Sequence, residues 1–312
     1  MIAVVASIKG APGVTTTAAA LATAWPPSRR VLLVEADPFG GDLAAWFGVA
    51  PSTGLWSLLA AGRRGLDPHA VWEHATTLPA GLAVLYGLAS ADQAVANEAA
   101  WPAVAEALAA LDADVVIDAG RLLPHFAGGV GSLLAQAHVL LVLCPPTLAG
   151  IVHLKTALPS LTTSSTSRRL MVLPTAQRGF SYKEIASTLK INVAPPIPHD
   201  PKGAAALTAN AIGSARSNTT LAKWAQSTTA ELVASSLTTA ATEAPLSLSE
   251  ITNHLLRPTI DGTEFGEAGH LAATDRRKDT PHRNNAHLLD DVEHTDSLDQ
   301  AVPTAAPTSV AQ

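Results

Sequence analysis

The 312-residue sequence predicts an α/β domain with a doubly wound, mostly parallel sheet, followed by a tail of different composition. Three observations lead to this prediction. Short apolar runs recur at long intervals, Ala- and Leu-rich segments of helical length lie between them, and the first run leads into a glycine-containing turn followed by threonines. Strand–helix alternation of this kind is typical of parallel sheets with crossover helices.

Seven apolar runs are the expected strands. Several are continuously apolar rather than alternating, which indicates strands buried on both faces. They are IAVVAS (2–7), VLLVEA (31–36), LAVLYG (82–87), DVVIDA (114–119), HVLLVL (138–143), RLMVLP (169–174) and NVAPPI (192–197). Helices are expected over residues 15–25 and 94–111, and a last helix is expected to run from Thr220 to about Leu237.

The longest apolar stretch, residues 137–154, approaches the length of a membrane-spanning helix. Pro145 and Pro146 divide it into a strand-sized and a helix-sized piece, so we expect a buried strand that leads into a helix. The first residues lack the basic region and the cleavage context of a signal peptide. We therefore expect a cytoplasmic protein.

Composition excludes several kinds of site. Hydrophobic residues make up 47% of the chain and the net charge is −6, so a sizeable core is expected and no overall basic field exists. Cys144 is the single cysteine, which excludes internal disulfides and cysteine-paired metal or iron–sulfur sites. It lies in an apolar run and is expected to be an inert, buried thiol. The histidines lack metal-ligand spacing, and no Gly-x-Ser-x-Gly elbow is present.

The composition changes near residue 238, so we divide the chain into a domain over 1–237 and a tail over 238–312. The tail holds twelve acidic and five basic residues, a charge of −7, which leaves about +1 for the domain. Because it has few aromatic residues and no strand-like run, we expect it to be disordered. Residues 247–257 have the pattern of a capped amphipathic helix, which is either a transient helix or a docking site for a protein partner.

The segment IKGAPGVTTT (8–17) has the outline of a phosphate-binding loop. Its glycines allow backbone N–H groups to approach phosphates at a helix N-terminus, and the first hydroxyl of such a helix binds Mg²⁺. Val14 stands where these loops carry a lysine. Because glycine- and threonine-containing turns are common after strands, the segment alone is a weak signal.

Acidic residues at the ends of two further strands strengthen the signal. Asp118 ends the run DVVIDAG, and Glu35 and Asp37 follow the second strand. The carboxyl ends of parallel strands meet at one edge of a sheet, where α/β proteins bind their ligands. Capping of strand ends is the alternative for either acid alone, but their occurrence together with the loop favours one shared site.

These segments resemble the ParA/MinD family of deviant-Walker-A P-loop ATPases, also described as CobQ/CobB/MinD/ParA-like. IKGAPGVTT resembles the family's KGGxGKTT loop, with Lys9 at the signature lysine, and ADVVIDAG resembles its Walker B strand. VLLVEADPFGGDLAAWFG resembles the second strand and switch I, and AHVLLVLCPPTLAGIVHL the strand and helix that follow. RLMVLPTAQRGFSYKEIASTL and VAPPIPHDPKGAAAL resemble the base-binding region and closing strand. The resemblance covers roughly residues 1–235.

The resemblance implies a P-loop NTPase of ParA/MinD type that binds ATP and Mg²⁺. Lys9 would reach phosphates, either in its own site or across a nucleotide-sandwich dimer, and Asp37 would position the attacking water. Thr15 would bind the metal directly, and Asp118 would hold it through water. The residues implied to contact the nucleotide are Lys9, Gly10, Ala11, Gly13, Val14, Thr15, Thr16, Thr175, Pro198 and Asp200.

Two residues depart from the family pattern. Ala11 replaces a glycine, and Val14 replaces the lysine that follows Gly13. Valine offers no charge to the phosphates, and one hydrogen bond to a charged group is worth roughly 1.5–3 kcal/mol, so we expect affinity to be about 10- to 100-fold lower. The transition state should lose more. We therefore expect nucleotide binding with slow hydrolysis.

The leading hypothesis is an ATP-dependent partition or positioning switch that dimerises on nucleotide. The alternative is a pseudo-ATPase scaffold that binds protein partners without turnover; a biosynthetic ligase lacks a recognisable second-substrate pocket. Basic residues of the domain are either a surface for non-specific DNA or ordinary solvated charges. They are Arg63, Arg64, Arg168, Arg169, Lys183, Lys190, Lys202, Arg216 and Lys223. Membrane attachment by a basic C-terminal helix is not expected, because the tail is acidic.

Overall fold

The computed structural model describes residues 1–10, 13–122, 129–163, 169–208 and 218–242. The chain divides into two units, 1–252 and 253–312. All described residues belong to the first unit. The predicted docking segment at 247–257 and nearly all of the predicted tail lie outside the described residues.

Eight strands form one sheet in the order β3-β4-β2-β5-β1-β6-β7-β8. All neighbouring strands pair in parallel except β3, which is antiparallel to β4. The strands are β1 (Ile2–Ser7), β2 (Val31–Glu35), β3 (Thr76–Thr77), β4 (Ala83–Leu85), β5 (Asp114–Arg121), β6 (Val139–Cys144), β7 (Arg169–Pro174) and β8 (Asn192–Val193).

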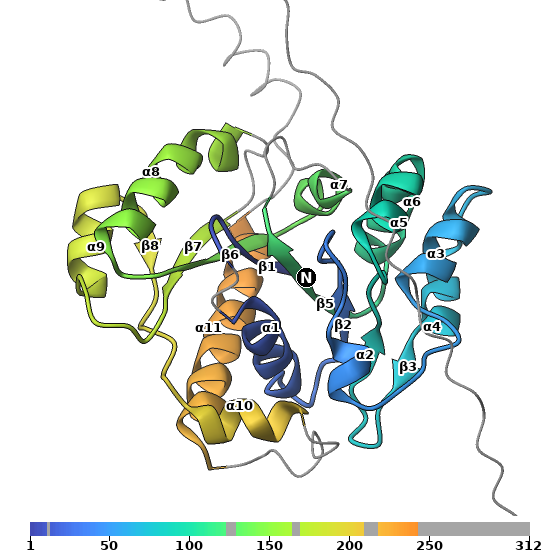
Figure 1. Ribbon diagram of the computed structural model, residues 1–312, viewed down its shortest axis with the longest axis horizontal. Coiled ribbons are helices and arrows are strands. Elements are labelled where there is room, and N and C mark those ends of the chain that lie inside the picture. The colour runs from blue at the N-terminus through green and yellow to red at the C-terminus, as the bar shows by residue number, and fades with distance from the viewer. Residues whose placement is uncertain (11–12, 123–128, 164–168, 209–217, 243–312) are drawn as a thin grey trace, which may run out of the picture. The chain divides into compact units, whose positions relative to one another are not determined.

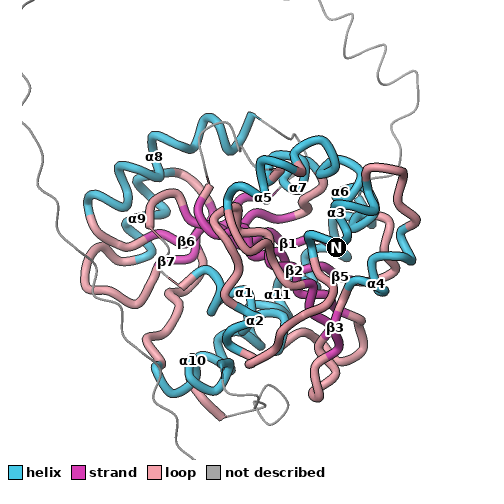
Figure 2. Tube along the Cα trace, turned by 45° about the vertical axis from the view of Figure 1, so that its right-hand side comes forward, coloured by secondary structure: helices cyan, strands magenta, loops and turns pink. Residues whose placement is uncertain are grey.

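Helices cover both faces of this sheet (Figure 1), and the strands form a single central layer (Figure 2). The α-helices are α1 (Val14–Thr23), α2 (Leu43–Trp46), α3 (Leu55–Gly62), α4 (Val71–His74), α5 (Ala91–Ala96), α6 (Trp101–Ala109), α7 (Val130–Ala135), α8 (Leu148–Thr163), α9 (Tyr182–Leu189), α10 (Pro201–Thr208) and α11 (Thr220–Thr242). Two short 3₁₀ helices are η1 (Pro68–Ala70) and η2 (Glu98–Ala100). Among the described residues, no helix combines the length and apolar character needed to cross a bilayer.

Two hydrophobic cores lie on opposite faces of the sheet. Along β1, Val4 and Ala6 belong to the core shared with α3, α6, α7, α8 and α9, whereas Ala3 and Val5 belong to the core shared with α1, α10 and α11. Successive side chains of a strand point to opposite faces, so both sets must be apolar. This is why the strands read as continuous apolar runs in the sequence.

The predicted fold class is confirmed, and a strand overlaps each of the seven predicted strand segments. The last prediction was too long: of residues 192–197 only Asn192 and Val193 pair with β7, because Pro195 and Pro196 lack the N–H that a strand donates. The short strand β3 was missed, since its two threonines carry no apolar pattern.

The predicted division of residues 137–154 is also confirmed, because β6 ends at Cys144 and α8 begins at Leu148. The single helix predicted over 94–111 is wrong. The chain forms α5, then η2, then α6, with Pro102 in the first turn of α6, where proline is tolerated. The last helix ends at Thr242, five residues beyond the expected Leu237.

The strand order places β1 between β5 and β6, at the point where the chain reverses its direction across the sheet. In the register, Asp118 of β5 lies beside Val5 of β1 on one side and beside Glu35 of β2 on the other. The end of β1, the phosphate-loop segment and both acidic strand ends therefore meet at one edge of the sheet. Open α/β sheets bind ligands at such a point.

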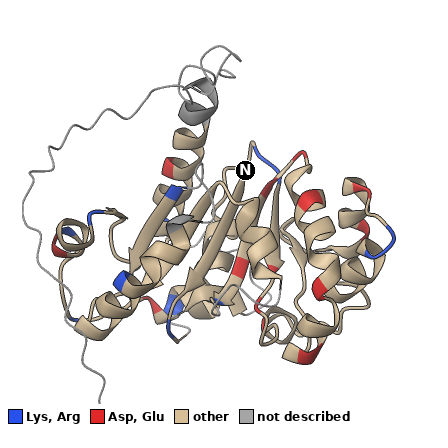
Figure 3. Ribbon diagram, turned by 90° about the horizontal axis from the view of Figure 1, so that it is seen from above, with Lys and Arg blue, Asp and Glu red and all other residues tan. Residues whose placement is uncertain are grey.

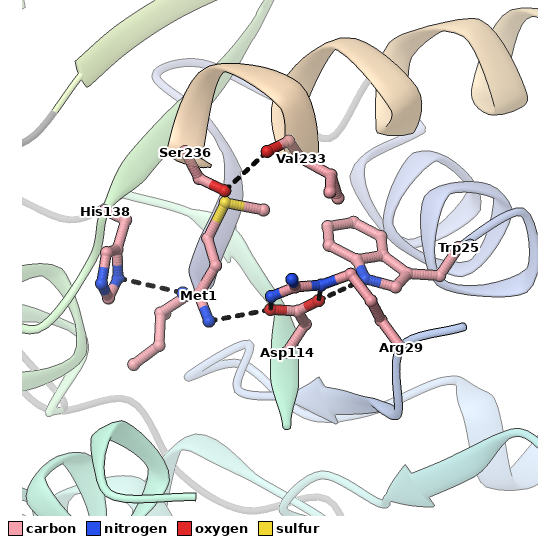
Figure 4. A network of polar contacts seen from close by, with 8 residues as sticks. Met1, Trp25, Arg29, Asp114, His138, Val233 and Ser236 are labelled. Atoms are coloured by element: carbon pink, nitrogen blue, oxygen red, sulfur yellow. Dashed lines mark hydrogen bonds and ion pairs between the residues drawn. The ribbon is translucent and has the colours of Figure 1, made fainter. Parts of the chain in front are cut away.

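A network of polar contacts closes the opposite, amino-terminal edge around Asp114 (Figure 4). The Asp114 carboxylate accepts hydrogen bonds from Trp25 Nε1 at 2.7 Å, from Arg29 Nε and from Arg29 Nη2 at 2.7 Å, and its Oδ1 lies 2.8 Å from the Met1 ammonium. Burial alone would raise the pKa of Asp114, but these donors lower it to about 2. The network joins β5 to the segment before β2 and to the start of β1.

Close packing joins α6 to α7. Trp101, the first residue of α6, is 1% exposed, and Gly129, which precedes α7, has a φ of 87°. A Cβ atom on Gly129 would overlap the Trp101 ring. This contact fixes the start of α7 against α6, on the stretch of chain that follows β5.

Replacing Gly129 by alanine is expected to destabilise the fold by about 2–4 kcal/mol. The left-handed φ costs a residue with a Cβ roughly 1–2 kcal/mol, and overpacking against Trp101 adds about 1–3 kcal/mol. Urea unfolding of the purified chain measures the difference. Gly81→Ala is a matched control, because Gly81 also has a φ of 87° and a Cβ there has no atom within 4 Å. Equal losses in the two variants would contradict the packing argument.

Candidate functional site

The phosphate-loop segment connects β1 to α1 at the carboxyl edge of the sheet. Gly13 adopts a φ of 87° as the N-cap of α1, and its carbonyl accepts hydrogen bonds from Thr17 N at 2.9 Å and from Thr17 Oγ1 at 2.8 Å. The first turn of α1 contains no acidic residue, so its amide dipoles favour an anion. The predicted contact at Ala11 lies outside the described residues.

Ser7, which the sequence analysis did not select, ties this loop to β5. Its hydroxyl contacts the carbonyl of Gly10, lies 3.5 Å from the carbonyl of Gly120, and is fully buried. Leu122 N also donates to the carbonyl of Ser7 at 2.8 Å. A buried hydroxyl at the last position of an otherwise apolar strand was the available signal.

Thr15 and Asp118, the two predicted metal-side residues, are brought together. The Thr15 hydroxyl lies close enough to the Asp118 carboxylate to lower its pKa, and Asp118 Oδ1 accepts from Gly120 N at 3.0 Å. Asp118 Oδ2 is buried and has no partner among the described residues. An unpaired buried carboxylate oxygen is costly, which makes it available to a ligand or to water.

The charge of Asp118 is poorly stabilised at this site. Burial, with smaller contributions from the carboxylates of Glu35 and Asp37, raises the pKa of Asp118 to about 7 against the opposing effects of Thr15 and Gly120. No basic side chain is among the causes of the shift. A bound cation would therefore favour the ionised carboxylate.

Asp37 follows β2 and lies against Gly120, because a Cβ on that glycine would overlap the Asp37 carboxylate. Its Oδ1 accepts a hydrogen bond from Phe39 N at 2.8 Å. Burial raises the pKa of Asp37, as does the nearby Asp42, while the Phe39 amide opposes the shift. Asp37 thus lies against Gly120, which follows Asp118 by two residues in β5, and its predicted role stays a prediction.

Glu35 has a different place from Asp37, with which the sequence grouped it. Its Oε1 accepts from the amides of Asp42 at 2.6 Å and Leu43 at 2.8 Å, and its Oε2 accepts from Gly87 at 2.9 Å. Both oxygens are therefore engaged, although burial still raises the pKa of Glu35. Glu35 anchors the loop after β2 to the end of β4, and so holds Asp37 in position.

Val14, which stands at the usual lysine position of the loop, and Lys9 differ sharply in exposure. Val14 is 1% exposed and packs in the core between α1 and the sheet. Lys9 is exposed, and its Nζ lies 2.9 Å from Nε2 of His153 on α8. In the described part of the loop, Lys9 is therefore the single basic side chain.

The predicted base-binding residues lie after β7 and before α10. Thr175 is 8% exposed, and its Oγ1 is buried without a partner among the described residues. Pro198 is half-buried. The Asp200 carboxylate accepts from Gly203 N, Thr220 Oγ1 and Leu221 N, each at 2.9 Å. These bonds lower the pKa of Asp200 to about 2 and connect α10 with α11, so Asp200 has a structural role.

These observations fit a magnesium–nucleotide complex better than a metal bound by protein alone. In the described part of the chain, no group of three or more His, Cys, Asp or Glu residues is placed to hold a metal ion. Mg²⁺ commonly takes one or two protein oxygens and completes its shell with phosphates and water. Thr15 and Asp118, with its free Oδ2, offer oxygens of that kind. The roles of Thr16, Thr175 and Pro198 stay predictions.

Comparison with known proteins identifies the fold. No family profile matches the sequence, and no curated protein sequence matches it. Among solved structures, a ParA family ATPase from Chlorobium tepidum TLS is similar, with 18% identity over 74% of this chain and 98% of that one, at a TM-score of 0.62. The cell division ATPase MinD of Pyrococcus furiosus has 19% identity, the same coverage of both chains and a TM-score of 0.59.

A third structure contains a nucleotide. It is the septum site-determining protein MinD from Pyrococcus horikoshii OT3 in complex with Mg-ADP, with 17% identity over 74% of this chain and 95% of that one, at a TM-score of 0.59. The TM-scores show a common fold, and the coverage shows that almost the whole of each similar chain is matched. The chain has the fold of the ParA/MinD P-loop ATPases.

The raised pKa of Asp118 predicts a specific pH dependence of stability. A carboxyl whose pKa is about 7 when folded and near 3.8 when unfolded stabilises the fold below about pH 4. That contribution is lost as the pH rises towards 7, at up to about 1.4 kcal/mol per pH unit. Urea unfolding of wild type and Asp118→Asn between pH 4.5 and 8 should show a steeper loss of stability with rising pH in wild type than in the variant, which keeps only the contributions of Glu35 and Asp37. Parallel curves would contradict the assignment, since Glu35 and Asp37 are common to both proteins.

Proposed function

We propose that this protein is a nucleotide-dependent switch that binds Mg·ATP at the carboxyl edge of its sheet and hydrolyses it slowly. The observation that carries the proposal is the Thr15–Asp118 pair, in which one carboxylate oxygen of Asp118 is buried without a partner among the described residues and Asp37 lies close by. Glu35 and Asp118 are buried at this edge, and the hydrogen bonds of Glu35 to three backbone amides leave Asp118 as the buried carboxyl that lacks a full set of partners. The MinD structure with Mg-ADP adds support from a protein of the same fold.

Each residue has a chemical task in this proposal. The backbone of Gly10 and Gly13, with the N-terminus of α1, holds the phosphates, and Lys9 supplies a positive charge. Thr15 binds the metal, and Asp118 holds it through water; the metal would neutralise the phosphates' charge. Asp37 orients the attacking water. The nucleotide is also contacted by backbone or side-chain atoms of the loop residues Ala11, Val14 and Thr16. The base is bordered by Thr175, Pro198 and Asp200.

The proposed biological role is partition or positioning of a cargo, as a switch that dimerises when ATP is bound. Slow turnover would leave binding, rather than a rapid hydrolytic cycle, to drive the switch. The similar structures come from a ParA family ATPase, a cell division ATPase and a septum site-determining protein. Their cargo and partners are not transferred to this chain.

The proposed surface for non-specific DNA lies in the half of the domain built from β6–β8. Residues 122–237 carry nine basic and three acidic residues, whereas residues 1–121 carry six basic and eleven acidic residues. Figure 3 marks the positions of these residues on the ribbon, with most of the red segments on the side opposite α8–α11. DNA contacts through this basic half are part of the proposal, because phosphate binding of this kind needs charge rather than a shaped site.

The second candidate is a pseudo-ATPase scaffold, which the burial of Val14 favours. A side chain that is part of the core does not reach the phosphates, so one contact that raises ATP affinity in P-loop proteins is missing. In that case the surface and the tail would bind protein partners without nucleotide turnover.

Titration with Mg·ATP decides between these candidates. We expect binding in the micromolar range by calorimetry and a rise in mass towards a dimer by light scattering. Lys9→Ala should weaken binding by about 10-fold, as expected for loss of a hydrogen bond to a charged group. Lys223→Ala, on a helix away from the loop, is the control. No binding up to millimolar Mg·ATP would contradict the switch and leave the scaffold.

Restoring a lysine at position 14 tests whether the remaining site is competent. Val14→Lys is expected to raise Mg·ATP affinity and turnover about 10-fold or more, and to cost about 1–3 kcal/mol of stability, because a longer side chain enters a packed core. Val14→Met is the matched control, since it has similar length without the charge. A steady-state phosphate-release assay measures turnover. An equal rate in both variants would mean that the residues around Asp37 do not support hydrolysis.

A further inference from the structure

A cavity lies at the amino-terminal edge of the sheet, opposite the edge that holds the phosphate-loop segment. Its volume of about 610 Å³ falls within the range of about 300–1,000 Å³ that sites for small ligands usually have. The segment before β2, the η1–α4 stretch and the turn between α6 and β5 border it. Trp72 and Leu111, which also pack against the core, give it apolar surface.

Arg30, which the sequence analysis did not select, provides a cation at this cavity. Its guanidinium carbon lies 3.5 Å from the centroid of the Trp72 ring on α4, and its carbonyl accepts from Asp114 N at 2.8 Å. The ring contact restricts the guanidinium, and the backbone bond ties the residue to the start of β5. Because the guanidinium forms no hydrogen bond or ion pair with the described residues, its fork of N–H donors is available to a carboxylate.

The turn after α6 provides the opposite charge. Asp112 is exposed, borders the same cavity and is not ion-paired with Arg30 or with any other described residue. The last turn of α6 contains no basic residue, so the negative end of its dipole, next to Ala110, has no cation from its own helix. This side of the cavity therefore favours a positively charged group.

Asp114, the other carboxylate at this cavity, is already paired with cations of the fold. It lies 2.8 Å from the Met1 ammonium and accepts from Arg29 Nη2 at 2.7 Å (Figure 4). Arg30 and Asp112 are thus the charged groups left for a ligand, together with the exposed imidazole of His69 at the same cavity.

We propose that this cavity is a binding site for an amino acid with an apolar side chain. Arg30 pairs with its carboxylate, Asp112 and the end of α6 attract its ammonium, and its side chain contacts Trp72 and Leu111. A simple anion would meet the charge of Asp112 and a simple cation that of Arg30, which together select a zwitterion. The inference does not rest on the proposed function, because the two sites share no residue.

Spectra of ¹⁵N-labelled full-length protein test the site with L-phenylalanine as the probe. The indole N–H of Trp72, assigned by its loss in Trp72→Phe, and the Nε–H of Arg30 should shift with a dissociation constant in the millimolar range. Phenylpropanoate, which lacks the ammonium, and phenylethylamine, which lacks the carboxylate, should each bind about 10-fold more weakly. Equal binding of the three probes, or no shift with any of them, would overturn the proposal.

Two variants test the two charges separately. Arg30→Met keeps an unbranched side chain over Trp72 without the guanidinium, so phenylalanine should bind about 10-fold more weakly and no better than phenylethylamine. Asp112→Asn should likewise make phenylalanine bind no better than phenylpropanoate. Arg64→Met and Asp92→Asn, which change exposed charges outside the cavity, are the matched controls. An equal loss in the controls, or no loss in Arg30→Met, would contradict the site, provided that all variants unfold in urea as wild type does.

Lys9→Ala separates this site from the proposed nucleotide site. It should bind L-phenylalanine as wild type does, since Lys9 belongs to the opposite edge of the sheet. Phenylalanine binding that depends on Lys9 rather than on Arg30 would place the ligand at the phosphate loop and overturn the inference. If Mg·ATP does not bind, the proposed nucleotide function falls, whereas this inference stands as long as phenylalanine binding depends on Arg30 and Asp112.

Discussion

The parallel pairing of β1 with β5 is the constraint on which the candidate site depends. It places Asp118 beside Val5, so that the chain leaving β1 passes directly over the end of β5. The Ser7 hydroxyl then reaches the carbonyls of both Gly10 and Gly120, and Thr15 reaches the Asp118 carboxylate. Without this register, the glycine loop and the acidic strand ends would have no common location.

The strand β5 shows how surroundings decide what a buried aspartate does. Asp114 begins the strand and Asp118 lies four residues later, and both are 1% exposed. Asp114 is surrounded by donors from Trp25, Arg29 and Met1, and its pKa is about 2. Asp118 has no such cation, and its pKa is about 7. The charge of Asp114 is stabilised by groups of the fold itself, whereas the charge of Asp118 has no cationic partner there.

Much of the fold could be predicted because buried parallel strands have a strong signature. Continuous apolar runs identified β1, β2 and β4–β7, and Pro145–Pro146 correctly separated β6 from α8. The break between α5 and α6 was missed, since alanine-rich segments look helical until tertiary contacts, here around Trp101, decide where they turn. The length of β8 was overestimated because an apolar count ignored the missing donors of two prolines.

The site was predictable in its residue types and less so in its contacts. Thr15, Asp37 and Asp118 were found because strand ends and a helix start are visible in a sequence. The tasks of Glu35 and Asp200 were not visible, since their partners are backbone amides brought together by folding. The burial of Val14 could not be predicted either, because the sequence does not show whether a valine after a glycine loop is part of a core.

The separation of charge along the chain gives the domain an electric dipole moment. Its β6–β8 half is basic in composition and the half built from residues 1–121 is acidic. Near a polyanion, the field would exert a torque that turns the basic end forward before any contact is made. The effect would reach only a few Debye lengths, about 8 Å each at physiological salt. Two such molecules would also attract one another most strongly when their dipoles are antiparallel or head to tail.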